Sequence, residues 1–135
     1  MGKDFERWAN RKQELDTNAK RPFYHAREIW WSAVGTNVGN EIDGTGREYD
    51  RPLIILRAFN AETFLGIALT GHHRSGRYYF PLGKIGDRDA SANLSQVRLY
   101  DTKRLIRKIG TLEERTFHEL ARAVTLTIFP FLDIK

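Results

Sequence analysis

The chain has 135 residues, 41% of them hydrophobic, and it carries a formal net charge of +5 with a pI of about 9.7. This length suits one domain with one core. The absence of cysteine excludes a disulfide framework and any thiolate metal site. No apolar run is long enough to cross a bilayer, and the charged N-terminal stretch lacks the apolar segment of a signal peptide. We therefore expect a cytoplasmic protein without a membrane association.

The pattern of helix formers, turn residues and apolar runs predicts a helix, a series of short strands and a second helix. Residues 3–20 contain neither Gly nor Pro and predict the first helix, whose thin apolar stripe includes Phe5, Trp8, Ala9 and Leu15. The predicted strands span residues 27–34, 52–59, 64–69, 77–82, 94–99 and 104–109.

Two polar segments separate these strands and are expected to be loops, residues 35–50 and residues 83–91. Gly110 and Thr111 are expected to open the final helix, with Thr111 and Glu114 at the spacing of a capping box. Short, closely spaced strands favour a mainly β fold, a small antiparallel barrel. We assign this barrel to residues 25–135 and an N-terminal helical extension to residues 1–24.

The stretch GREYDRPLIIL, residues 46–56, places Arg51 at the mouth of the most hydrophobic segment. If the strands on either side of residues 60–63 form a hairpin, Arg51 and Thr70 become neighbours at one rim of the sheet. A guanidinium fork can bind two phosphate oxygens, and a hydroxyl can add one further hydrogen bond. The pair therefore suits a phosphodiester, whereas a solvated or carboxylate-paired strand-edge arginine is the alternative.

A basic turn, GHHRSGR at residues 71–77, is followed directly by the aromatic run at residues 78–80. Basic side chains next to aromatic rings are typical of surfaces that bind single-stranded nucleic acid. The turn supplies four candidate RNA-binding residues, His72, His73, Arg74 and Arg77. The two adjacent histidines point opposite ways on an extended backbone and make a poor metal pair, so we expect no metal and no cofactor.

The segments EIWW, GTNVGNEIDGTG, RPLIIL, IALT and LSQVRLYDTKRLIRKIG follow one another in an order and with gaps that are specific in combination. From Arg27 to Val124 this pattern resembles the MazF/PemK family of toxin endoribonucleases. The resemblance implies an SH3-like β-barrel of the CcdB/PemK type with C-terminal helix, and a homodimer. It also implies metal-independent cleavage of single-stranded RNA (mRNA) at short sequence motifs, and neutralisation by a cognate antitoxin.

The same resemblance assigns roles to individual residues. Arg51 falls on the family's catalytic arginine, and Thr70 falls on the threonine or serine that ends the following hairpin. The implied RNA-contacting positions are Asn40 and Glu41 in the first loop and Gln96 and Arg98 in the LSQVR segment. Ser95 stands where some members have an acidic residue, so a mechanism with that acid as general base does not carry over.

The implied reaction uses the 2′-OH of the RNA as nucleophile, which gives a cyclic phosphate and a 5′-OH. Arg51 suits charge stabilisation, whereas the histidines of the basic turn have the pKa range of a proton shuttle. Two other classes of protein stay open at this point: a barrel that binds nucleic acid or an antitoxin without cleaving, and a CcdB-like gyrase inhibitor.

Overall fold

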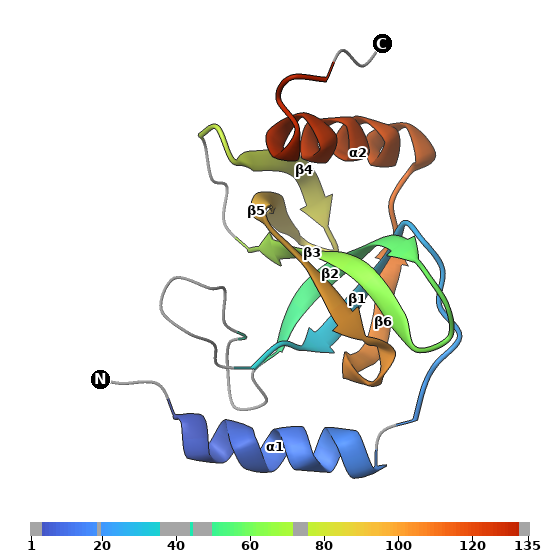
Figure 1. Cartoon of the computed structure of the whole chain (residues 1–135). Coiled ribbons are helices and arrows are strands. Elements are labelled where there is room, and N and C mark those ends of the chain that lie inside the picture. The colour runs from blue at the N-terminus through green and yellow to red at the C-terminus, as the bar shows by residue number, and fades with distance from the viewer. Residues whose placement is uncertain (1–3, 19, 36–43, 45–49, 72–75, 133–135) are drawn as a thin grey trace.

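The computed structural model describes residues 4–18, 20–35, 44, 50–71 and 76–132. Six strands form one antiparallel sheet in the order β4-β5-β3-β2-β1-β6, with a helix before β1 and a helix after β6 (Figure 1). The elements are α1 (Phe5–Asn18), β1 (Glu28–Ala33), β2 (Asp50–Ala58), β3 (Thr63–Thr70), β4 (Tyr79–Ile85), β5 (Arg88–Asp101), the 3-10 turn η1 (Thr102–Arg104), β6 (Leu105–Thr111) and α2 (Glu114–Ile128).

The sheet curls so strongly that both of its faces are buried in the centre. On β2, Ile54 belongs to one apolar cluster, while Leu53 and Ile55 belong to a second cluster on the other face. All three side chains are fully buried. Burial on both faces explains why this strand is a continuous apolar run and does not alternate with polar residues.

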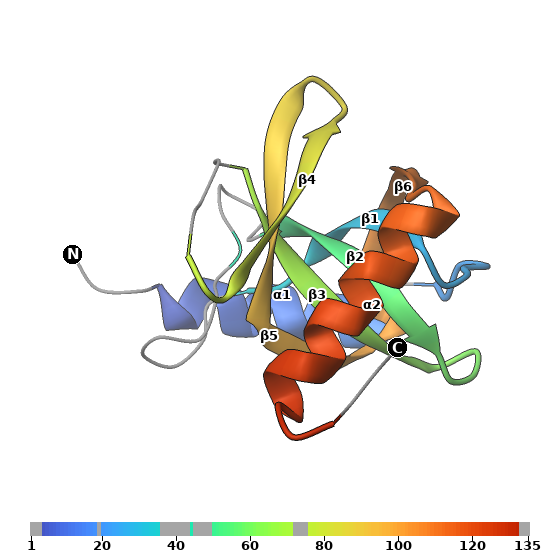
Figure 2. The same ribbon diagram turned by 90° about the horizontal axis from the view of Figure 1, so that it is seen from above.

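The two helices lie at opposite ends of the curled sheet (Figures 1 and 2). Leu120 and Val124 of α2 pack into the first apolar cluster, close to β4 and β5. On α1, Trp8 and Leu15 are buried as predicted, whereas Phe5 and Ala9 are exposed. The predicted stripe of α1 is therefore narrower than expected, and only one side of the helix touches the domain.

Two predicted boundaries are wrong. Residues 83–91 are not a loop, because β4 and β5 pair up to Ile85 and Arg88 and leave only a tight turn between them. Thr111 does not cap α2, because it still pairs with Glu28 at the end of β6. The helix begins at Glu114 after an N-cap, Glu113, that makes no side-chain capping bond.

The mainly β prediction is confirmed, with a curled six-stranded antiparallel sheet that forms an open barrel between two helices. Neither of the two described helices is long and apolar enough to cross a membrane.

Candidate active site

Arg51 and Thr70 lie side by side at one rim of the sheet. The β2–β3 register pairs Leu53 with Ala68, so two residues further on Arg51 stands opposite Thr70. The Nη1 atom of Arg51 donates a hydrogen bond to the carbonyl oxygen of Leu69 at 3.0 Å. Thr70 is only 9% exposed and Arg51 is half-buried. The predicted closeness of the two residues is confirmed, and the backbone of β3 helps to orient the guanidinium.

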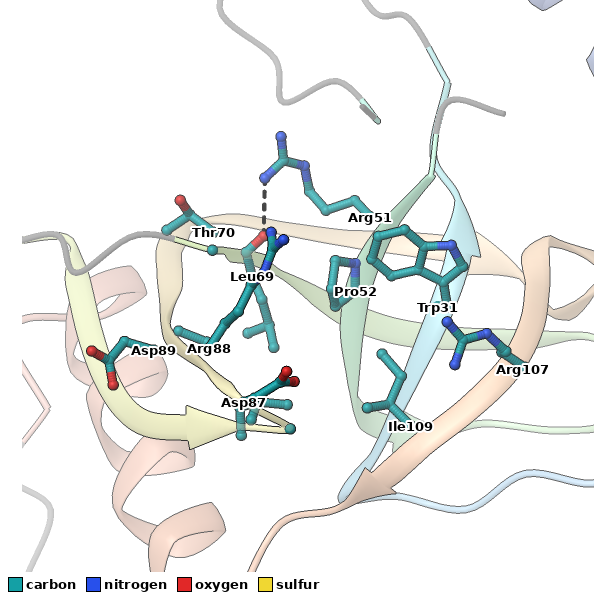
Figure 3. A pocket seen from close by; sticks show the side chains of 14 residues that line it. Trp31, Arg51, Pro52, Leu69, Thr70, Asp87, Arg88, Asp89, Arg107 and Ile109 are labelled. Carbon is teal, nitrogen blue, oxygen red and sulfur yellow. Dashed lines mark hydrogen bonds between the residues drawn. The ribbon is translucent and has the colours of Figure 1, made fainter. Parts of the chain in front are cut away.

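Both residues line a pocket of about 700 Å³ (Figure 3). Part of its apolar surface comes from Trp31, Pro52 and Ile109, which lie on neighbouring strands of the sheet. Trp31 pairs with Pro52 on one side and with Arg107 on the other, so three adjacent strands each present a side chain to the same hollow.

The turn between β4 and β5 forms the opposite wall of the pocket and brings three charged residues to it: Asp87, Arg88 and Asp89. Figure 3 shows Arg88 directed from this hairpin toward Leu69 and Thr70. With Arg51 and Arg107, three arginines from three separate elements line one pocket. Guanidinium groups are the preferred protein partners of phosphate oxygens, so this lining favours a phosphate-containing ligand.

The pattern of the sequence did not assign the hairpin wall to the site. Its signal was nevertheless present, because Gly86-Asp87 stands between two short runs and is a dipeptide typical of tight hairpin turns. Gly86 has a φ of +66°, a conformation that glycine adopts without strain. The polar composition of residues 83–91 hid this signal because the tip of the hairpin, residues 86–89, is exposed.

Five predicted RNA-binding residues lie outside the described residues, namely Asn40, Glu41, His72, His73 and Arg74. Arg77 is described, lies just before β4 and is exposed, with its guanidinium carbon 5.5 Å from the centre of the Tyr78 ring. Tyr78 is itself 45% exposed, whereas Phe80 packs against the first apolar cluster. Arg77 and Tyr78 therefore form an accessible cation–aromatic pair, which does not itself line the described pocket.

Gln96 and Arg98 lie on β5 near a large irregularity. The β3–β5 register slips between the pairs Ile67–Val97 and Leu69–Ala92, so that residues 93–96 bulge out opposite the end of β3. Ser95 donates its hydroxyl to the Asn93 side chain at 2.9 Å within this bulge. Gln96 is half-buried there and, like Arg98, is not among the described residues that line the pocket.

A second group of cations surrounds Tyr100 on the other face of the sheet. Burial raises the pKa of Tyr100, and the positive charges of Arg98, Arg104 and Arg51 act in the opposite direction. Arg98 also lies over the Tyr100 ring at 5.2 Å from its centre. Arg51 and Arg98 therefore both act on Tyr100, but of these two only Arg51 is among the described residues that line the pocket.

The pocket offers hydrogen-bond donors to an anion and an aromatic surface to a base. Within the described ranges, no three His, Asp or Glu side chains form a group that could hold a metal ion. The molecule is thus a small open β-barrel with an arginine–threonine pair at the rim of a pocket lined by three arginines, a lining suited to an anionic ligand such as a phosphodiester.

The comparisons with known proteins identify the family. Residues 25–128 match the family model of the PemK-like, MazF-like toxins of type II toxin–antitoxin systems, and the chain belongs to this family. A search of curated protein sequences finds no significant match.

Several solved structures share the fold. One is described as an endoribonuclease in complex with its cognate antitoxin from a mycobacterial species, with a TM-score of 0.59, 13% identity, and coverage of 83% of this chain and 100% of that chain. Toxin MazF-mt6 of Mycobacterium tuberculosis gives a TM-score of 0.59 at 17% identity, covering 80% of this chain and 100% of that chain. The MazE–MazF complex of Deinococcus radiodurans gives 0.57 at 10% identity, covering 80% and 97%.

Proposed function

We propose that this chain is a toxin-type endoribonuclease that cleaves single-stranded RNA at short sequence motifs. The observation that carries the proposal is the Arg51–Thr70 pair at the rim of a pocket that two further arginines also line. Membership of the MazF-like toxin family supports a toxin, and the structural neighbours described as endoribonucleases support this reaction.

In the proposed reaction the 2′-oxygen of one ribose attacks the adjacent phosphorus atom. The bond from phosphorus to the 2′-oxygen forms while the bond from phosphorus to the 5′-oxygen of the next nucleotide breaks. The 2′-OH gives up its proton and the leaving 5′-oxygen gains one, so the products are a 2′,3′-cyclic phosphate and a 5′-OH. The nucleophile belongs to the RNA, which means that the protein needs only to orient groups, stabilise charge and move protons, and that DNA is not cleaved.

Arg51 is the charge-stabilising group in this scheme. Its Nη1 atom donates a hydrogen bond to the Leu69 carbonyl oxygen at 3.0 Å, which orients the guanidinium at the pocket, where it can stabilise the negative charge that develops on the nonbridging phosphoryl oxygens. Arginine stays protonated in proteins, so Arg51 is a poor proton donor. Thr70 orients the 2′-OH or binds a phosphoryl oxygen from the neighbouring strand.

Proton transfer requires a group other than Arg51 and Thr70. Among the described lining residues the carboxylates are Asp87 and Asp89 on the β4–β5 turn. A carboxylate can accept the 2′-proton directly or through one water molecule. We assign this role to Asp87 or Asp89, since Ser95 is not among the described residues that line the pocket and donates its hydroxyl to Asn93.

The substrate suits the shape and chemistry of the pocket. Trp31 offers a ring face to an unstacked base, and unpaired RNA can present its bases in this way. Arg88 and Arg107 lie where they can bind the phosphates that flank the cleaved bond. As part of the same proposal, the enzyme is a cytoplasmic homodimer whose activity a cognate antitoxin neutralises.

The proposal is tested by incubating the purified chain with end-labelled single-stranded RNA in the presence of EDTA. We expect discrete fragments with the wild-type protein and none above background with Arg51→Ala. RNA that is bound and shifted but left intact by the wild-type protein would contradict the enzyme and favour a binding-only barrel.

A further inference from the structure

The N-terminal helix packs directly on the backbone that leads to Arg51. Trp8 of α1 is 3% exposed and lies against Gly35, which follows the end of β1. A Cβ atom added to Gly35 would overlap the Cε2 and Cζ2 atoms of the Trp8 ring. Gly35 also has a φ of +89°, which favours glycine for a second reason. Only a residue without a side chain lets the indole approach this closely.

Arg104 of η1 binds the same end of β1. Its Nη1 atom donates hydrogen bonds to the carbonyl oxygens of Ala33 at 3.1 Å and Val34 at 3.4 Å. The guanidinium carbon lies 5.7 Å from the centre of the Trp8 ring, at a distance typical of a cation–π contact. Burial lowers the pKa of Arg104, and the charge of Arg98 acts in the same direction, whereas Tyr100 and Asp101 act in the opposite direction. The end of β1 thus contacts both Trp8 and Arg104.

This end of β1 carries the strand pairs that place the proposed catalytic arginine. Ser32 pairs with Arg51, and Ala33 pairs with Asp50. Ala33 is fully buried and belongs to one apolar cluster with Trp8 and Leu15. Residues near the end of a ladder open locally at low cost unless other contacts hold them. Trp8 supplies such a contact one residue away from the Ser32–Arg51 pair.

The helix is fixed to the domain at its other end as well. Lys103 Nζ donates to the carbonyl oxygen of Asp16 at 2.7 Å. Beyond the helix, Arg21 Nη1 donates to Asp101 Oδ1 at 2.7 Å and to the carbonyl oxygen of Glu62 at 3.1 Å. The family model begins at residue 25, so α1 is an addition to the part of the chain that the family model matches.

We infer that α1 is a positioning element of the active site, which holds Arg51 in place through the contact of Trp8 with Gly35 and Ala33. The inference rests on the proposed catalytic role of Arg51. Trp8 itself does not line the described pocket and acts through the strand pair. A small displacement of a catalytic group costs up to about 100-fold in rate, so a loose β1 end would lower kcat, while Trp31, further from that end, keeps its strand pairs with Pro52 and Arg107.

The test compares Trp8→Ala with Leu15→Ala. Both substitutions remove a buried apolar side chain from the same face of α1, but only the first removes the ring from Gly35. We expect Trp8→Ala to lower kcat about ten-fold or more with KM little changed, Trp8→Phe to restore most of the rate, and Leu15→Ala to keep it. If Trp8→Ala fails to fold, Trp8→Leu, which keeps apolar bulk without a flat ring, takes its place.

A double-mutant cycle with Gly35→Ala tests the contact itself. Alone, Gly35→Ala must displace the indole and should reproduce the loss of kcat seen with Trp8→Ala. In thermal unfolding, Gly35→Ala should cost less stability in the Trp8→Ala background than in the wild type. The backbone strain at residue 35 is the same in both backgrounds, but the overlap with the indole ring occurs only in the wild type.

The outcomes separate the inference from the proposed function. RNA cleavage that Arg51→Ala abolishes and Trp8→Ala leaves at the wild-type kcat would overturn the inference and leave the proposed function standing. Equal losses of kcat in Trp8→Ala and Leu15→Ala, or additive effects in the cycle, would also overturn it. A wild-type protein that cleaves no RNA would contradict both.

Discussion

Replacing Arg51 tests the proposal that its guanidinium, which binds the protein backbone through one nitrogen, stabilises the substrate phosphate. Arginine has five N–H donors, and one nitrogen of Arg51 is already bonded to the Leu69 carbonyl oxygen. Arg51→Ala removes every donor aimed at the phosphate. The loss of one preorganised donor to a developing oxyanion costs about 3–4 kcal/mol, which corresponds to a rate lower by roughly 100- to 1,000-fold.

Arg51→Lys distinguishes charge from geometry. A lysine keeps the positive charge but has a single nitrogen, which cannot bond to Leu69 and hold two phosphoryl oxygens in the geometry of the fork. We expect a rate between those of the wild type and Arg51→Ala. Loss of the Leu69 bond should lower the free energy of unfolding by about 1 kcal/mol in Arg51→Ala, since the carbonyl lies at the rim where water can replace the donor.

The assay is single-turnover cleavage of a short RNA with protein in excess, which reports the chemical step without product release. Arg57→Ala is the matched control, because Arg57 is an exposed arginine on the same strand outside the described pocket lining. Both variants remove one positive charge. Equal rates for Arg51→Ala and the wild type would refute the assignment, and equal losses in Arg51→Ala and Arg57→Ala would show that only the overall charge matters.

Three further predictions concern the partners of Arg51, the walls of the pocket and the stability of the sheet. Thr70→Val keeps the shape but removes the hydroxyl, so single-turnover rates should fall about five-fold while Thr70→Ser stays active, as expected for one lost hydrogen bond of about 1 kcal/mol. Arg88→Ala and Arg107→Ala should weaken RNA binding, and the slope of log Kd against log salt should fall by about 0.7 for each lost phosphate contact; an unchanged slope would argue against that contact. Burial raises the pKa of Glu28, but hydrogen bonds from Trp30, His25 and Lys108 outweigh it and hold the pKa below the usual value of 4.5. The carboxylate of Glu28 therefore binds a proton less tightly in the folded state than in the unfolded state. The stability that Glu28 contributes is present above pH 4.5 and is lost as the pH falls through the lower pKa of the folded state. The melting temperature of Glu28→Gln should therefore fall less at acid pH than that of the wild type.

The sequence predicts that Arg51 and Thr70 lie close together, because the β2–β3 hairpin alone determines their positions. The two strands are apolar, adjacent in the chain and joined by a short link. The local pattern of the sequence is therefore enough to predict that they pair, and that Arg51 and Thr70 are neighbours at the rim of the sheet. The observed register and the bond from Arg51 to Leu69 agree with this expectation. The catalytic roles of the two residues stay a prediction.

The other wall of the pocket depends on contacts that no local pattern contains. Arg107 and Trp31 come together because β6 crosses to pair with β1, far away in the sequence. Arg88 reaches the same pocket because β5 pairs with β3 as well as with β4. Residues 98–108 are rich in Arg and Lys, but which of these side chains faces the pocket follows only from the curl of the sheet.

The boundary errors have a common physical cause. Strand pairing satisfies backbone groups that an isolated segment would leave to turns or caps. Thr111 has the spacing of a capping residue, yet the ladder with β1 recruits it, and Leu112 continues this pairing by donating its N–H to the Arg27 carbonyl oxygen. Trp8 likewise looked like one member of a thin helical stripe, and its importance comes from Gly35, a residue 27 positions away in the chain.

In the proposed mechanism the RNA supplies its own nucleophile in a pocket built around Arg51. This mechanism is tested most directly with an RNA that carries a single 2′-deoxy nucleotide on the 5′ side of the mapped cleavage site, incubated with the wild-type protein in EDTA. From this mechanism we expect the all-RNA strand to yield a 2′,3′-cyclic phosphate and a 5′-OH, and the single deoxy substitution to block cleavage at this site. Cleavage of the substituted strand at the same position and rate would contradict it.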